Sequence, residues 1–139
     1  MKKVLIKIKG TQGLDGDTDI VELSTEGTLR SFNGDYILTY SEEDTIAGKK
    51  TKTQLTVQNN NTVVLDRRGE LTSRFVITKG ERNSCLYSIP QGSLTLGIYG
   101  KDVTANLNEC GGTLKMSYSI DANLQPLSEN TVEITVQER

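Results

Sequence analysis

The segment Leu114-Lys115-Met116-Ser117-Tyr118-Ser119-Ile120 alternates strictly between apolar and polar residues. Successive side chains of a β-strand point to opposite faces, so this period of two places the apolar residues on one buried face. The same alternation recurs along the chain, at Tyr36-Leu38-Tyr40, Val63-Leu65, Leu94-Leu96-Ile98 and Val132-Ile134-Val136. The sequence therefore predicts a protein of many strands, each with one face in a core and the other in water.

Turn-forming residues interrupt this alternation at short intervals, as tight turns between antiparallel strands require. A hairpin is expected over 19–33, with its turn at Glu26-Gly27, and loops are expected at 10–17, 43–51 and 79–83. At most a single helical turn fits, at 123–129. The other predicted strands are 3–9, 35–42, 53–58, 62–68, 71–78, 84–89, 93–100, 103–109, 113–121 and 130–137.

These strands predict the fold class. The chain of 139 residues is long enough for one core and too short for two, so we expect one domain over 1–139. Many short strands with regular turns are typical of an all-β protein with one antiparallel barrel of about 8–10 strands and little or no helix. Closing the barrel would remove the exposed edges that so many strands otherwise create.

Composition and charge argue against several partners. The net charge is −2 and Lys is interleaved with Asp and Glu, so the sequence gives no electrostatic support for nucleic-acid binding. No apolar stretch approaches the roughly 18–20 residues that span a bilayer. Residues 1–9 begin like a signal peptide, but Lys7 and Lys9 alternate with isoleucine and indicate a strand. A cytoplasmic protein without a membrane partner is expected.

The side chains needed for common catalytic and metal sites are scarce. The chain has no histidine and two cysteines, Cys85 and Cys110, which excludes a Ser-His-Asp triad and a four-ligand zinc site. Both cysteines are expected to be reduced and to pack in or beside the sheet. The acidic stretch 15–19 resembles half of a calcium loop, but a solvated turn is the better interpretation. We expect no enzyme activity, no cofactor and no metal.

A group of polar residues shares a predicted face with apolar ones. Glu42 follows Leu38 and Tyr40 at a period of two, and Arg67 follows Val63 and Leu65. Both end their strands, so the two side chains are expected at the same mouth of the sheet, where an inward Arg67 would take Glu42 as its partner. Tyr87 and Tyr118 add phenols on faces predicted to point inward. The candidate ligand-binding residues are Tyr40, Glu42, Arg67, Tyr87 and Tyr118.

The order of several short motifs resembles a known family. These are Tyr40-Ser41-Glu42-Glu43, a threonine at 51 or 53, Arg67-Arg68-Gly69, Phe75, Tyr87 followed by Gly92, and Gly111-Gly112-x-Leu114-x-x-x-Tyr118. In this order the chain resembles the YwiB-like family of uncharacterised bacterial proteins. The resemblance implies a calycin-type, lipocalin-like antiparallel barrel, no known function and no catalytic residues. The chain has no tryptophan, so it lacks the Gly-x-Trp signature of secreted lipocalins.

Two functions of different classes fit this reading. The first is a binding module that holds a small, partly apolar ligand with an anionic or hydrogen-bonding group inside the barrel or at its mouth. The alternative is a filled structural barrel that binds a protein partner, including a second copy as a homodimer, through outward apolar residues. The residues expected to face outward for this role are Val21, Leu23, Ile37, Val64 and Val76.

Overall fold

The computed structural model describes residues 2–14, 17–43, 50–58, 61–69, 73–89 and 92–139. Within these ranges, ten strands form one antiparallel sheet in the order β6-β5-β4-β3-β2-β1-β10-β9-β8-β7. The strands are β1 (Lys2–Leu14), β2 (Asp17–Phe32), β3 (Asp35–Glu43), β4 (Lys50–Gln58), β5 (Thr62–Arg68), β6 (Ser73–Thr78), β7 (Arg82–Ile89), β8 (Gly92–Asn108), β9 (Gly111–Ala122) and β10 (Gln125–Glu138). The predicted antiparallel barrel of eight to ten strands is confirmed.

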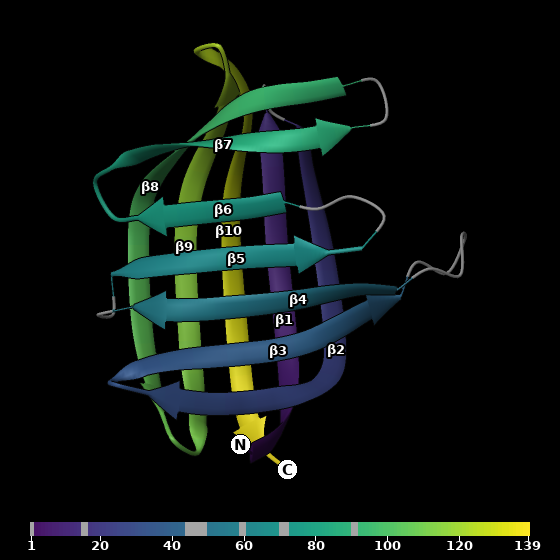
Figure 1. Ribbon diagram of the computed structural model, residues 1–139, viewed down its shortest axis with the longest axis vertical. Helices are drawn as coiled ribbons and strands as arrows, with labels where there is room; N and C mark the ends of the chain where they lie inside the picture. Colours follow the sequence, from purple (N-terminus) through teal and green to yellow (C-terminus); the bar gives the residue numbers. More distant parts are fainter. Residues whose placement is uncertain (1, 15–16, 44–49, 59–60, 70–72, 90–91) are drawn as a thin grey trace.

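The sheet folds into two layers whose strands cross at a steep angle (Figure 1). β3 to β7 run across the front, and β1, β9 and β10 run along the back, with the two layers enclosing the interior. β2 and β8 belong to both layers, because each bends from one direction into the other. Strands that change layer in this way make the corners of orthogonally packed sheets.

The long strand β2 corrects the predicted hairpin over 19–33. It runs without a turn from Asp17 to Phe32 and pairs with β1 along its whole length. Gly27 marks its bend, since a Cβ there would lie 2.4 Å from the carbonyl oxygen of Thr39. The glycine permits a close approach of two backbones, a role that the sequence cannot distinguish from a turn.

Two other predicted interruptions are also wrong. Gly10 to Leu14 continue β1 instead of forming a loop. The predicted turn at 100–102 is an irregularity of the β8–β9 register between Gly100 and Asp102, so β8 continues through it. Such a bulge strengthens local twist, and it lies where β8 changes direction. The actual turn after β2 is Asn33-Gly34, where both residues have positive φ, as two-residue hairpins require.

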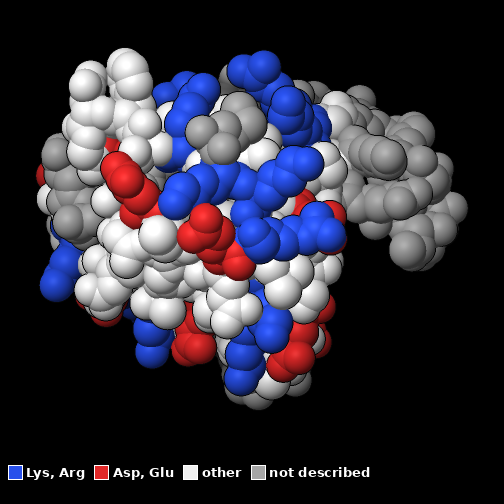
Figure 2. All heavy atoms as spheres, turned by 90° about the horizontal axis from the view of Figure 1, so that it is seen from below, with Lys and Arg blue, Asp and Glu red and all other residues white. Residues whose placement is uncertain are grey.

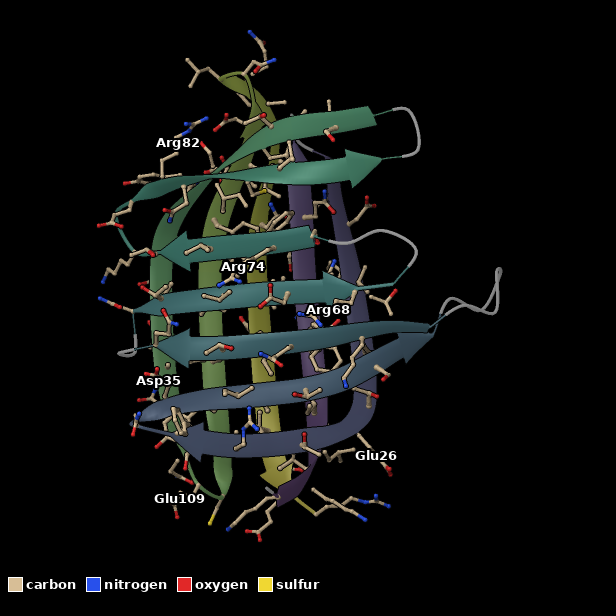
Figure 3. The ribbon with its side chains drawn as sticks, in the orientation of Figure 1. Glu26, Asp35, Arg68, Arg74, Arg82 and Glu109 are labelled. Atoms are coloured by element: carbon tan, nitrogen blue, oxygen red, sulfur yellow. The ribbon has the colours of Figure 1, made fainter. Side chains whose placement is uncertain are left out.

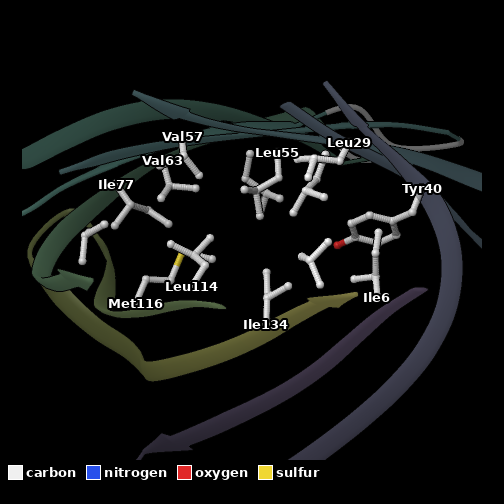
Figure 4. Close-up of a cluster of buried hydrophobic side chains, with 14 of the residues drawn as sticks. Ile6, Leu29, Tyr40, Leu55, Val57, Val63, Ile77, Leu114, Met116 and Ile134 are labelled. Carbon is white, nitrogen blue, oxygen red and sulfur yellow. The ribbon is translucent and has the colours of Figure 1, made fainter. Parts of the chain in front are cut away.

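The core is built by the inward faces of the alternating strands. Ile6, Leu38, Ile77 and Leu114 are fully buried, and they come from both layers. Figure 4 shows these apolar side chains facing one another between the layers, with the Tyr40 ring beside Ile6. The part of the barrel interior around these residues is therefore filled mainly by aliphatic side chains.

Part of the barrel is closed by few backbone contacts. β6 and β7 are the ends of the strand order, and they meet near the bend of β8. Gly80 donates to the carbonyl of Gly100 at 2.8 Å, and Gly100 donates to the carbonyl of Glu81 at 3.0 Å. The Asn83 side-chain amide adds a bond to the carbonyl of Val76 at 3.3 Å. We call this contact the β6–β7 seam.

The outer surface carries charges of both signs, and three of the five apolar residues expected there, Ile37, Val64 and Val76, are on the outer face. Val21 and Leu23 were expected to face outward, but they pair with Gly10 and Ile8 and line the interior. The wrong orientation of Val21 and Leu23 follows from the predicted turn at Gly27, because a turn there would have changed which residues of the strand face inward. Val64 does face outward but is 5% exposed.

The described part of the chain has no helix of the length and apolarity that crossing a membrane requires.

Candidate functional site

A row of polar residues crosses the front layer of the barrel on its inner face. Tyr40 pairs with Thr53, Thr53 pairs with Arg67, and Arg67 pairs with Ser73, so the row crosses β3, β4, β5 and β6. The next inward row along the same strands is Leu38, Leu55, Leu65 and Phe75. The inner face thus changes from apolar to polar within a single step of two residues.

The back layer carries a matching polar row. Tyr118 pairs with Asn130, Asn130 pairs with Gln12, and Gln12 pairs with Asp19, across β9, β10, β1 and β2. The neighbouring inward row is apolar, and it consists of Met116, Val132, Gly10 and Val21. Both layers therefore become polar towards the same end of the barrel.

A cavity of about 570 Å³ lies between these rows. Leu55, Leu65, Met116 and Ile134 form apolar parts of its wall, and Tyr40, Arg67, Tyr118 and Asn130 supply polar groups. Small-molecule sites have volumes of roughly 300–1,000 Å³ and combine an apolar lining with a few polar groups that fix orientation. In size and lining, this cavity is of that kind.

Arg67 lies on the predicted face but is not buried as expected. It shares the interior side with Val63 and Leu65, and it lines the cavity. Because Arg67 is at the end of β5, its side chain is exposed to solvent at the mouth. A solvated guanidinium needs no buried partner, so the expected requirement for a pairing with Glu42 does not hold. Among the described residues, no carboxylate forms a salt bridge with Arg67.

Tyr118 is the buried phenol of the cavity wall. Its side chain is 8% exposed, and burial raises the pKa of its hydroxyl above the ordinary value. The positive charge of Arg67 acts in the opposite direction and lowers that pKa. The two side chains are thus close enough to interact although they come from opposite layers. At neutral pH, Tyr118 is a neutral hydrogen-bond donor next to a fixed cation.

Thr53 is buried between Tyr40 and Arg67 in the front polar row. Its side chain is fully buried, and its hydroxyl oxygen has no hydrogen-bond partner. A buried hydroxyl without a partner costs free energy, so its presence beside a cavity indicates a place where a polar atom can be held. Asn130, in the back row, is half-buried and donates to the hydroxyl of Ser128 at 2.9 Å.

Two of the five predicted site residues cannot be placed as side chains. The backbone of Glu42 pairs with Thr51, and the backbone of Tyr87 pairs with Leu94. The side chains of both residues lie outside the described part of the structure. The structure brings the other three, Tyr40, Arg67 and Tyr118, together on the wall of one cavity. The acidic stretch 15–19 also falls partly outside the described residues.

Sequence reasoning missed the polar residues that extend the two rows. Gln12 continues the alternation Val4, Ile6, Ile8 and Gly10, and Asn130 precedes Val132 with the same period. A polar residue at the inward position of an otherwise apolar alternation was the available signal. Gln12 was missed because residues 10–17 were predicted as a loop. Asn130 was missed because it was predicted as the first residue of a strand, whereas β10 begins at Gln125.

The two cysteines and the described acidic residues lie outside the polar rows of the cavity, apart from those that line it. Cys85 is half-buried, Cys110 is exposed at the β8–β9 turn, and both are free thiols. Burial raises the pKa of the Cys85 thiol, which keeps it protonated and unreactive. In the part of the chain that is described, no three Cys, Asp or Glu side chains cluster in a way that could hold a metal ion.

Comparisons with known proteins agree with the fold. A family model described as a domain of unknown function (DUF1934) matches residues 6–134. The crystal structure of the ywiB protein from Bacillus subtilis matches with a TM-score of 0.87 and 22% sequence identity, over 99% of this chain and 92% of that chain. No curated protein matches the sequence. At this identity the likeness to the solved structure shows the fold alone.

Proposed function

This chain belongs to the DUF1934 family, a family of unknown function, and we propose that it binds a small, partly apolar molecule with an acidic group. The observation that supports this most directly is the meeting of two polar rows at one cavity with an otherwise apolar wall. Its apolar part would receive the hydrocarbon portion of the ligand, and burial of that portion would supply most of the affinity.

Arg67 is the residue proposed to receive the acidic group. It is the cation on the cavity wall, and guanidinium groups bind carboxylate and phosphate oxygens through paired hydrogen bonds. Tyr118, whose phenol is neutral at neutral pH, would donate a further hydrogen bond to the same group. Thr53 offers a hydroxyl that has no partner among the described residues.

The proposal is tested with a probe that combines an apolar ring system and an anionic group, such as anilinonaphthalene sulfonate. We expect Arg67→Gln to weaken binding of this probe by about tenfold or more, as loss of a charged hydrogen bond does. Arg74→Gln is the matched control, because Arg74 is an exposed arginine of the neighbouring strand β6 that lies on the outer face beside Asp66. Equal affinities for the wild type and both variants would overturn the proposal.

Native mass spectrometry on protein purified from its own host addresses the natural ligand. A co-purifying small molecule that is absent from the Arg67→Gln variant but retained by Arg74→Gln supports the same site. A molecule retained by both variants would place binding elsewhere and contradict the role of Arg67.

A specific observation also favours the alternative of protein interaction. β2 pairs with β3 only from Gly27 to Phe32, so no described strand covers its other edge over Asp17–Glu26. On this edge Ile20 is 61% exposed, and its side chain is on the opposite face of β2 from the cavity-lining Val21. Unpaired edges with apolar residues are sites of strand addition. Sedimentation of the wild type and of Ile20→Lys tests this second candidate, which requires an oligomer that the substitution dissociates.

A further inference from the structure

A second hollow lies on the outer face of the barrel, and Tyr40 lines both this hollow and the cavity. It has a volume of about 740 Å³ and is lined by residues of β2, β3 and β4. Gly27 and Tyr40 form the last described pair between β2 and β3, and beyond it the two strands separate. The hollow is therefore located at this fork, where the bend of β2 carries the strand into the other layer.

Three basic side chains flank the hollow. Arg30 and Lys52 line it, and both are exposed. Arg68 is directly opposite Lys52 on the neighbouring strand. The Cβ atoms of such a pair lie about 4.5–5.5 Å apart, so the two positive side chains are neighbours. Among the described residues, none of these three cations takes part in a salt bridge.

Two described acidic groups near the hollow form ion pairs with other cations. Glu26 lines it, but its carboxylate is bound to the guanidinium of Arg139 at 2.8 Å. Asp66, further along the outer face, lies 3.8 Å from Arg74. Figure 3 labels Arg68 and Arg74 on the neighbouring strands β5 and β6. In the view from below, which looks at the end of the barrel where the chain termini lie, Lys and Arg side chains are interspersed with Asp and Glu (Figure 2).

Like charges placed directly opposite each other in a sheet repel, and an anion bound between them removes that repulsion. Hydroxyl groups of Thr28, Thr39 and Ser41 line the same hollow and can donate to an anionic oxygen. We propose that this hollow binds an oxyanion of the phosphate type, held by Lys52, Arg68 and Arg30. The site is separate from the cavity ligand proposed above, because these residues are on the opposite face of the sheet.

The test titrates the protein with inorganic phosphate, at ionic strength held constant with chloride, and follows the backbone amides by NMR. Constant ionic strength is necessary because salt alone screens exposed charges. We expect amide shifts confined to the segments around Arg30, Ser41, Lys52 and Arg68. The double variant Lys52→Gln/Arg68→Gln should bind phosphate at least about tenfold more weakly.

Lys115→Gln is the matched control, since Lys115 is an exposed lysine of β9 that is paired with Glu133 at 3.7 Å. It should retain wild-type phosphate binding. A parallel titration with a short single-stranded oligonucleotide distinguishes free phosphate from phosphate carried on a polymer. Binding of either probe that the double variant loses supports the site. Shifts that persist in the double variant, or that are spread over the whole surface, would overturn it.

Discussion

At the scale of single residues, Thr53 gives the sharpest test of the interior. Its hydroxyl is buried without a partner, and valine has nearly the same shape without the polar atom. We expect Thr53→Val to raise the free energy of unfolding by about 1 kcal/mol, because a buried unsatisfied hydroxyl opposes folding. Urea denaturation of the two proteins without added ligand measures this difference.

Thr56→Val is the control for that substitution. Thr56 is on the same strand but on the outer face, where it pairs with Ile37 and Val64. Its replacement should change the free energy of unfolding by under about 0.5 kcal/mol. A clear loss of stability in Thr53→Val would mean that a bound water or ligand satisfies the hydroxyl in solution.

Arg67 shows what a residue pattern can and cannot predict. The alternation with Val63 and Leu65 correctly placed it on the interior face, because the period of a strand is local. Its burial was predicted wrongly, since burial depends on how far the opposite layer extends over the end of β5. That extension is set by the bends of β2 and β8, which no local pattern encodes.

At the scale of elements, the bend of β2 depends on Gly27. A Cβ at this position would lie 2.4 Å from the Thr39 carbonyl oxygen and 2.8 Å from Cδ1 of Ile6. Because the first of these atoms belongs to the backbone of β3, it cannot move without disturbing the sheet. We expect Gly27→Ala to lower the free energy of unfolding by about 1–3 kcal/mol or more. Chemical denaturation is the measurement.

Gly10 provides a matched comparison on the neighbouring strand. A Cβ there would have its nearest neighbour at 4.0 Å, the carbonyl oxygen of Val21. Gly10→Ala should therefore be neutral or stabilising by up to about 1 kcal/mol, because alanine restricts the unfolded chain. Equal losses for both variants would show that steric contact at the bend is not the reason for Gly27.

The same bend explains why the elements were only partly predictable. Strands β3 to β7 and β9 follow their alternation closely, and the sequence located each of them. β2 and β8 were divided at Gly27 and Gly100, because a glycine in a long strand gives the same local signal as a turn. The predicted site suffered from this as well, since Asp19 and Val21 were assigned to a separate hairpin instead of the cavity wall.

At the scale of the whole molecule, the barrel is held unevenly around its circumference. β1 pairs with β2 and β10 on both sides over most of its length, so its backbone groups are satisfied within the sheet. The β6–β7 seam instead depends on a few bonds around Gly80, Gly100 and Asn83. Segments with few backbone bonds open at lower free energy than the global unfolding reaction.

Hydrogen exchange tests this unevenness. Amides of β1 and β10 should exchange only through global unfolding, and those of β6 and β7 should exchange faster by local opening of the seam. Asn83→Ala removes the side-chain bond to Val76, so it should accelerate exchange in β6 and β7 while β1 changes little. Asn106→Ala, at an exposed position of β8, is the control and should leave the seam unchanged. Uniform exchange in all ten strands would contradict the prediction, because it would mean that the seam is as stable as the rest of the barrel.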